Sequence, residues 1–110
     1  MEITAKSFPA EVIQSSVPVF IECWASWCLP CKQVESVLER LKKKFDGRCE
    51  VLKINVDRNP IISIQYKING LPSFLTFING KEFERRVGSQ TEEQLIVMIL
   101  NAVKEFNNHE

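Results

Sequence analysis

Residues 19–45 read VFIECWASWCLPCKQVESVLERLKKKF, and the spacing of apolar side chains changes at a pair of cysteines. Residues 19–25 are β-branched and aromatic with few polar interruptions, which indicates a strand covered on both faces. In residues 30–45 apolar side chains recur at helical spacing, and Gly47 follows where a helix is expected to stop. The stretch therefore predicts a central strand, a turn that carries two thiols, and an amphipathic helix that begins at them.

The segments on either side of this stretch continue the alternation of strand and helix. A short strand near Ile3 precedes one or two helical turns, for which Ser7 is the expected N-cap. Residues 51–56 alternate as a second strand. Asn59 and Pro60 supply an N-cap and a first-turn proline for a short helix through Ile64.

The last third of the chain predicts a hairpin and a covering helix. Asn79-Gly80 is the pair best able to take the left-handed angles of a type I′ turn, so residues 73–78 and 81–87 are expected to pair. A capping box formed by Thr91 with Gln94, or by Ser89 with Glu92, starts a final amphipathic helix. The tail after Phe106 is expected to fray, and His109 within it to be solvated.

The chain is 110 residues long and is expected to form one domain, residues 1–110, with a frayed tail at 107–110. The element order is β-α-β-α-β-α-β-β-α, which places the chain in the α/β class with a parallel part and an antiparallel hairpin edge. Lys plus Arg equals Asp plus Glu at 14 each, so neither nucleic acid nor an anionic membrane is an expected partner. No signal peptide or membrane-spanning run is seen, which favours the reducing cytosol. In that compartment four cysteines are expected to be catalytic or metal-binding.

Cys28 and Cys31 lie three positions apart where the strand gives way to the helix, so their sulfur atoms can bond to each other. The start of the helix directs unpaired N–H groups and partial positive charge at Cys28, which lowers the pKa of that thiol. Pro30 suits the first helical turn and holds the loop rigid, and Lys32 adds positive charge. Cys28 is therefore the expected nucleophile, and Cys31 the thiol that resolves a mixed disulfide.

Five segments carry a resemblance to a known family: ECWASWCLPCK, LKINVDRNP, NGLPSF, FINGK and RVG, in that order and spacing. Over roughly residues 2 to 106 the chain resembles thioredoxin. The resemblance implies a thioredoxin fold, with a mixed five-stranded sheet flanked by four helices, and the reduction of protein disulfides. It also implies a thioredoxin-reductase-type electron donor, linked to a flavin or a ferredoxin, and neither a metal nor an organic cofactor on the chain itself. We expect a monomer.

By position, the resemblance assigns roles to particular residues. Cys28 attacks, Cys31 resolves, and Pro72 is the cis proline opposite them. Glu22 matches the buried carboxylate beneath the disulfide, Lys53 its lysine neighbour, and Trp24 the tryptophan beside the active site. The positions that match the partner-docking surface are Trp27, Leu71, Val87 and Gly88.

Some of these positions carry the same roles on physical grounds. Glu22 is a carboxylate in an apolar strand, so burial should raise its pKa and let it exchange a proton with Cys31. The alternatives are that its side chain reaches solvent or merely pairs with Lys53. Pro72 could instead be an ordinary proline at the start of a strand. Gly88, which has no side chain, would let a partner's backbone come close.

The chain departs from the family pattern near the thiols. Leu29 stands where glycine is usual, which changes the shape of the substrate-binding surface and the redox poise. Glu22 replaces aspartate and is one methylene longer, so proton transfer to Cys31 needs a different geometry or a water. Ser36 replaces a helix-kinking proline and predicts a straighter helix. Ser73 replaces threonine, which is a mild change.

Other functions stay open at this point. Cys23, Cys28 and Cys31, with Cys49 downstream, fit the spacing of plant-type iron–sulfur ligands, and a C-x-x-C pair also occurs in zinc sites. A thioredoxin-like adaptor with little turnover, or a net oxidase or isomerase, would use the same fold. Cys23 should be a small buried hydrophobe. Cys49, between Arg48 and Glu50, is expected to be exposed and open to intermolecular disulfides.

Overall fold

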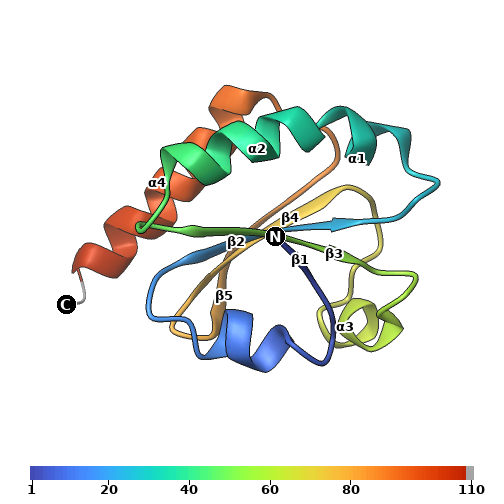
Figure 1. The fold of residues 1–110 in the computed structure, drawn as a ribbon, viewed down its shortest axis with the longest axis horizontal. Helices are drawn as coiled ribbons and strands as arrows, with labels where there is room; N and C mark the ends of the chain where they lie inside the picture. The colour runs from blue at the N-terminus through green and yellow to red at the C-terminus, as the bar shows by residue number, and fades with distance from the viewer. Residues whose placement is uncertain (109–110) are drawn as a thin grey trace.

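Five strands form one mixed sheet in the order β1-β3-β2-β4-β5, as Figure 1 shows for this computed structural model, which describes residues 1–108. Strands β1, β2 and β3 are parallel, and β4 and β5 run antiparallel to their neighbours. The expected central strand is confirmed, because β2 pairs with both β3 and β4. The bounds are β1 Glu2–Ile3, β2 Val19–Trp24, β3 Glu50–Asn55, β4 Ser73–Ile78 and β5 Lys81–Val87.

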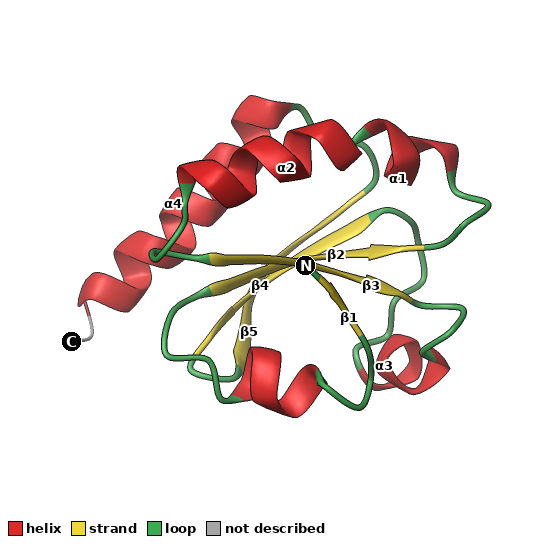
Figure 2. Cartoon of the chain, in the orientation of Figure 1, coloured by secondary structure: helices red, strands yellow, loops and turns green. Residues whose placement is uncertain are grey.

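Helices cover both faces of the sheet (Figure 2). One face carries α1, α2 and α4, and the other carries α3 and the short π-type helix η1 (Figure 1). This is the α/β architecture that the thioredoxin resemblance implies. The bounds are η1 Pro9–Ile13, α1 Leu29–Gln33, α2 Glu35–Lys44, α3 Pro60–Gln65 and α4 Glu92–Asn108.

The core has two parts because β2 is buried on both sides. Ile21 and Cys23 belong to the apolar cluster on the η1 and α3 face. Phe20 belongs to the cluster beneath α2 and α4. Successive side chains of a strand point to opposite faces, so Glu22 lies on the same face as Phe20. The strand that leads to the two cysteines is thus fixed by apolar packing, and a carboxyl group is buried in it.

The helix expected over residues 30–45 is present, but the expectation that it would be straighter is wrong. It is divided into α1 and α2 at Val34, although the chain has Ser36 in place of the kinking proline. The backbone of Val34, with φ −91° and ψ −3°, leaves the α-helical path while its side chain stays buried in the cluster beneath α2. The turn that bears the cysteines is therefore a short helical unit of its own.

Ser7 is not the N-cap of the first helical turns. Ser7 lies in the turn before η1, where its N–H donates to Thr4 Oγ1 at 3.3 Å and the Phe8 N–H donates to the Thr4 carbonyl at 2.9 Å. In return the Thr4 N–H donates to Ser7 Oγ at 3.0 Å. Thr4 and Ser7 therefore stabilise the turn that precedes η1, and the N-cap residue of that helix, Phe8, makes no side-chain cap hydrogen bond.

The hairpin and the last cap agree with the expectation. Asn79 and Gly80 have φ values of 51° and 80°, both in the left-handed region that a type I′ turn requires. Thr91 and Gln94 form the capping box, with N–H to side-chain distances of 2.8 and 3.1 Å. Helix α4 continues to Asn108, two residues beyond the predicted end at Phe106. Residues 109 and 110, with the expectation for His109, lie outside the described residues.

Candidate active site

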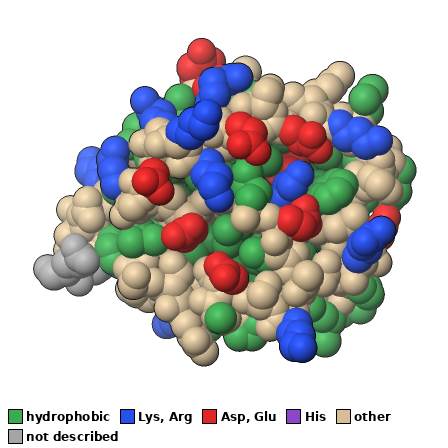
Figure 3. Space-filling model, in the orientation of Figure 1, with side chains coloured by type: hydrophobic (Ala, Val, Ile, Leu, Met, Phe, Trp, Pro, Cys, Tyr) green, Lys and Arg blue, Asp and Glu red, His purple; other side chains and the backbone are tan. Residues whose placement is uncertain are grey.

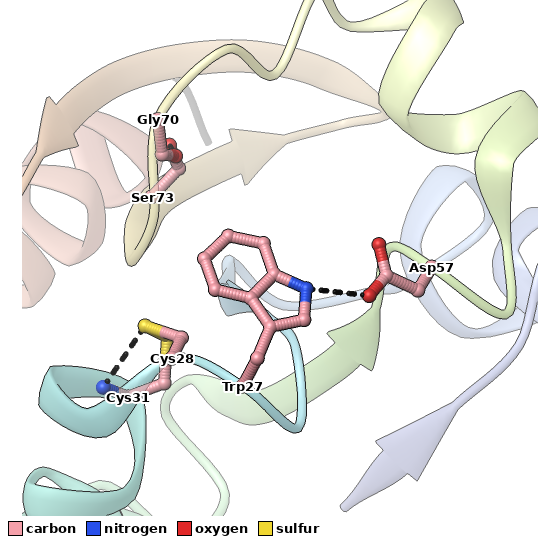
Figure 4. The surroundings of a disulfide bond; sticks show 6 residues. All are labelled: Trp27, Cys28, Cys31, Asp57, Gly70 and Ser73. Carbon is pink, nitrogen blue, oxygen red and sulfur yellow. Dashed lines mark hydrogen bonds between the residues drawn. A yellow bond between two sulfur atoms is a disulfide. The ribbon is translucent and has the colours of Figure 1, made fainter.

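Cys28 and Cys31 form a disulfide at the start of α1, with Cα atoms 5.3 Å apart (Figure 4). Cys28 is the N-cap residue, in extended conformation, and Pro30 lies in the first turn. The Cys31 N–H donates to Cys28 Sγ at 3.3 Å. Because free N–H groups at a helix start stabilise negative charge, this arrangement favours a thiolate at Cys28 once the bond is reduced.

The two cysteines are buried, and exposed apolar side chains flank them. Cys28 is 4% exposed and Cys31 only 1%. The flanking side chains are open to solvent, since Trp27 is 69% exposed and Leu29 63%. A partner protein would therefore meet an indole and a leucine on its way to the disulfide.

The indole of Trp27 is fixed by a residue that the sequence analysis did not single out. Its Nε1 donates to Asp57 Oδ2 at 2.7 Å (Figure 4). Asp57 follows β3 as Trp27 follows β2, and these neighbouring strands are parallel. The carboxyl ends of parallel strands meet at one edge of a sheet, and this signal could have identified Asp57.

The loop before β4 carries the expected cis peptide bond, between Leu71 and Pro72. Pro72 is buried and directly precedes β4, and its carbonyl accepts the Gly88 N–H at 2.8 Å. Leu71 is half-buried, and its own N–H and carbonyl form no hydrogen bond within residues 1–108. Val87, at the end of β5, is 51% exposed, and Gly88 has a φ of 91°. This loop thus offers an unpaired backbone beside an exposed apolar side chain.

Glu22 is buried in the sheet, with 1% of its surface exposed, so the alternative that it reaches solvent is wrong. In the described part of the chain its Oε2 has no hydrogen-bond partner. Burial raises the pKa of Glu22 from 4.5 to about 8, against the opposing effect of Lys53 and with smaller contributions from Glu35 and Glu2. A carboxyl group with this pKa can hold or release a proton near neutral pH.

Lys53 is a partly buried neighbour of Glu22 on β3, but it pairs with other carboxylates. Its Nζ lies 3.9 Å from Glu2 Oε1 and 3.8 Å from Glu35 Oε1. Within residues 1–108 the ion pairs of Lys53 do not include Glu22. The alternative of a simple Glu22–Lys53 pair is therefore wrong, and sequence reasoning missed the two acids that hold the lysine.

The remaining two cysteines lie apart from the disulfide. Cys23 is 2% exposed in the cluster on the η1 and α3 face, as expected. Cys49 is 4% exposed in the cluster beneath α2 and α4, so the expectation that it is exposed is wrong. It sits just before β3, where its side chain enters the core. Burial raises the pKa of each of these thiols to about 12.

The cysteines are not arranged as the ligands of an iron–sulfur cluster or a zinc ion within residues 1–108. Cys23 and Cys49 lie on opposite faces of the sheet, and Cys28 is bonded to Cys31. No three His, Cys, Asp or Glu side chains gather as a possible metal site anywhere in residues 1–108.

Among the described helices, none has the length and apolar character needed to cross a membrane. Figure 3 shows acidic and basic side chains interspersed over one face, without a large field of one sign.

Comparisons with known proteins point to the same chemistry. Residues 1–101 match the family model described as Thioredoxin. A thioredoxin of Rickettsia bellii is 37% identical over 101 residues, which cover 92% of this chain and 96% of the relative. A thioredoxin of Acidithiobacillus ferridurans is 37% identical, covering 88% and 90%, respectively. Thioredoxin 1 of a Nostoc species is 35% identical, covering 80% and 82%.

Proposed function

The chain belongs to the thioredoxin family and is a thiol–disulfide oxidoreductase, and on this premise we propose that it reduces disulfides of partner proteins in the cytosol. The observation that carries the proposal is the Cys28–Cys31 disulfide at a helix start, with the Cys31 N–H directed at Cys28 Sγ. This pair can be cycled between disulfide and dithiol, so the protein can pass two electrons to a substrate.

In the first step the Cys28 thiolate attacks one sulfur atom of the substrate disulfide. A bond forms between Cys28 Sγ and that sulfur, the substrate bond breaks, and the second substrate sulfur leaves as a thiolate that takes up a proton. The Cys31 N–H supports this role of Cys28, because a hydrogen-bond donor 3.3 Å from the sulfur stabilises its anionic form.

In the second step Cys31 attacks Cys28 Sγ, closes the ring and releases the second substrate thiol. Glu22 in its ionised form accepts the Cys31 proton, and burial supports this role because it raises the pKa of the carboxyl group to about 8, where the group can take up and release a proton near neutral pH. Overall one substrate disulfide becomes two thiols, and the protein dithiol becomes the Cys28–Cys31 disulfide. A thioredoxin-reductase-type donor then returns two electrons and two protons to the pair.

The substrate segment docks in extended form against the loop that carries the cis peptide bond. The N–H and carbonyl of Leu71, which have no hydrogen-bond partner within residues 1–108, are available to a substrate backbone, in the manner of an added strand. Trp27, Leu29 and Val87 supply exposed apolar contacts, and Gly88 leaves room for the substrate chain. We assign substrate binding to these residues and to Leu71.

The test is the reduction of insulin disulfides with dithiothreitol as electron source. The unmodified protein should accelerate reduction, and Cys28→Ser should abolish the acceleration. Cys49→Ala is the matched control, because Cys49 is buried away from the disulfide and should leave turnover in place. If the unmodified protein gives no acceleration, the adaptor function replaces this proposal.

The direction of electron flow depends on the redox potential of the Cys28–Cys31 pair. A midpoint potential near or below the cytosolic glutathione poise supports a reductase, and a value well above it supports an oxidase or isomerase. Equilibration in a dithiothreitol or glutathione buffer series measures it. We further propose that the protein acts as a monomer of one domain.

A further inference from the structure

A row of charged side chains crosses the sheet beneath α2. Glu2 of β1 is in register with Lys53 of β3, and Lys53 is in register with Glu22 of β2. Adjacent positions in register point to the same face of a sheet, so the lysine stands between two glutamates. Glu35, in the first turn of α2, lies close enough to the lysine to pair with it.

The Lys53 ammonium group is held toward Glu2 and Glu35. Its Nζ lies 3.9 Å from Glu2 Oε1, 3.8 Å from Glu35 Oε1, and 5.0 Å from the centre of the Trp24 ring. Trp24 in turn donates from Nε1 to Glu2 Oε2 at 3.2 Å. These contacts surround the lysine, which forms no ion pair with Glu22 within residues 1–108, although its charge still opposes the rise in the pKa of that carboxyl group.

We propose that Glu2 and Glu35 are positioning residues that hold the Lys53 ammonium group out of ion-pair contact with Glu22 and thereby control how readily this buried carboxyl group ionises. Glu22 is almost fully enclosed, whereas Glu2 and Glu35 are exposed. If the Lys53 ammonium group were released from Glu2 and Glu35, it could pair with the buried carboxylate of Glu22, its neighbour in register. In a low-dielectric site such a pair would draw the proton off Glu22.

Within residues 1–108, three charged side chains act on Glu22 from its neighbouring elements. Lys53 comes from β3, Glu2 from β1 and Glu35 from α2, and β4 presents the apolar Phe74 in register with Glu22. Cys28 and Cys31, at the start of α1, are joined in a disulfide and do not titrate in the oxidised protein. Among residues 1–108, the protonation of Glu22 in that state therefore depends on burial and on the charges of Lys53, Glu35 and Glu2.

The test follows the Glu22 carboxyl carbon by NMR as a function of pH in the oxidised full-length protein. We expect the double variant Glu2→Gln/Glu35→Gln to lower the pKa of Glu22 by about half a pH unit to one pH unit. Glu39→Gln is the matched control, since it removes an exposed carboxylate from the same helix. This control should leave the pKa of Glu22 unchanged.

A positioning role is separated from a direct charge effect by Lys53→Met. If the two acids act through the lysine, the change caused by Glu2→Gln/Glu35→Gln should fall to less than half in the Lys53→Met background. An equal change in both backgrounds overturns the proposal, as does an unchanged Glu22 titration in the double variant. Trp24→Phe retains an aromatic ring but removes the Nε1 donor to Glu2, and it should also lower the pKa of Glu22, by a smaller amount than the double variant.

The inference deepens the proposed function, because Glu22 is the proton carrier there, but its test does not depend on turnover. If Glu22→Gln leaves insulin reduction and its pH profile unchanged, the proton-carrier role fails while the titration result still stands. If the titration fails while Glu22→Gln impairs turnover, only the positioning role fails. The two outcomes are therefore distinguishable.

Discussion

Replacing Glu22 with glutamine should stabilise the folded protein, and increasingly so as the pH rises. Glu22 is enclosed in β2, and its Oε2 accepts no hydrogen bond within residues 1–108. Ionising it in place is costly, and for this reason its pKa is raised from 4.5 to about 8. Glutamine has nearly the same shape and no charge to bury.

The sign follows from proton binding in the two states. Between pH 4.5 and about 8 the folded protein holds the Glu22 proton and the unfolded chain has lost it, so stability falls as the pH rises through this window. At 1.36 kcal/mol per pH unit, the loss reaches about 3 kcal/mol at neutral pH and about 5 kcal/mol above pH 8 as an upper value. Below pH 4.5 both states are protonated and the loss vanishes.

The assay is urea unfolding of the oxidised protein at several pH values from about 4 to 9, with the disulfide intact. Glu22→Gln should match the unmodified protein within about 1 kcal/mol at the acid end, where a carboxylic acid and an amide make similar contacts. It should be more stable by several kcal/mol at the alkaline end. The control Glu39→Gln removes an exposed charge from α2 and should show a small difference that does not grow with pH.

A stability difference between Glu22→Gln and the unmodified protein that stays constant from acid to alkaline pH would refute this reasoning. It would mean that the carboxyl group ionises in the folded state as easily as in the unfolded chain. A difference that grows in the opposite direction would mean that the folded protein stabilises the carboxylate. In either case Glu22 would not be the carboxyl group poised to exchange a proton near neutral pH.

Three further predictions concern the turn, the buried thiol and the docking surface. Gly80→Ala should lower the free energy of unfolding by about 1–3 kcal/mol in urea melts, because φ at this position is 80° and the new Cβ would lie 2.8 Å from the Ile13 carbonyl oxygen. An unchanged unfolding midpoint would contradict the turn geometry. Cys49 should resist alkylation at neutral pH until the protein unfolds, because burial raises its pKa to about 12; rapid labelling of the native protein, followed by mass spectrometry, would contradict its burial. Trp27→Ala should raise the KM for insulin by about tenfold, the loss expected for an exposed aromatic anchor, and should affect a small chromogenic disulfide less. Equal losses with both substrates would argue against a docking role.

Sequence reasoning succeeded where the cause is local. The hairpin turn depends on the backbone preferences of Asn79 and Gly80, and both residues adopt the left-handed angles that the pair favours. The disulfide depends on the spacing of Cys28 and Cys31 at a helix start. It failed at Ser7, which forms hydrogen bonds with Thr4 in the turn before η1 and does not cap that helix. Local propensity did not show at which residue the helix begins.

The tertiary structure decided what depends on residues distant in the chain. The sequence shows that Glu22 is a carboxyl group in an apolar strand. It could not show that Glu2 and Glu35 form ion pairs with the neighbouring Lys53. Those acids belong to an edge strand and a helix that meet only after the sheet is assembled. Cys49 likewise looked exposed between two charged neighbours and proved buried once α2 and α4 covered that face. Periodicity and turn chemistry act between near neighbours, whereas burial and charge pairing are set by side chains that folding brings together.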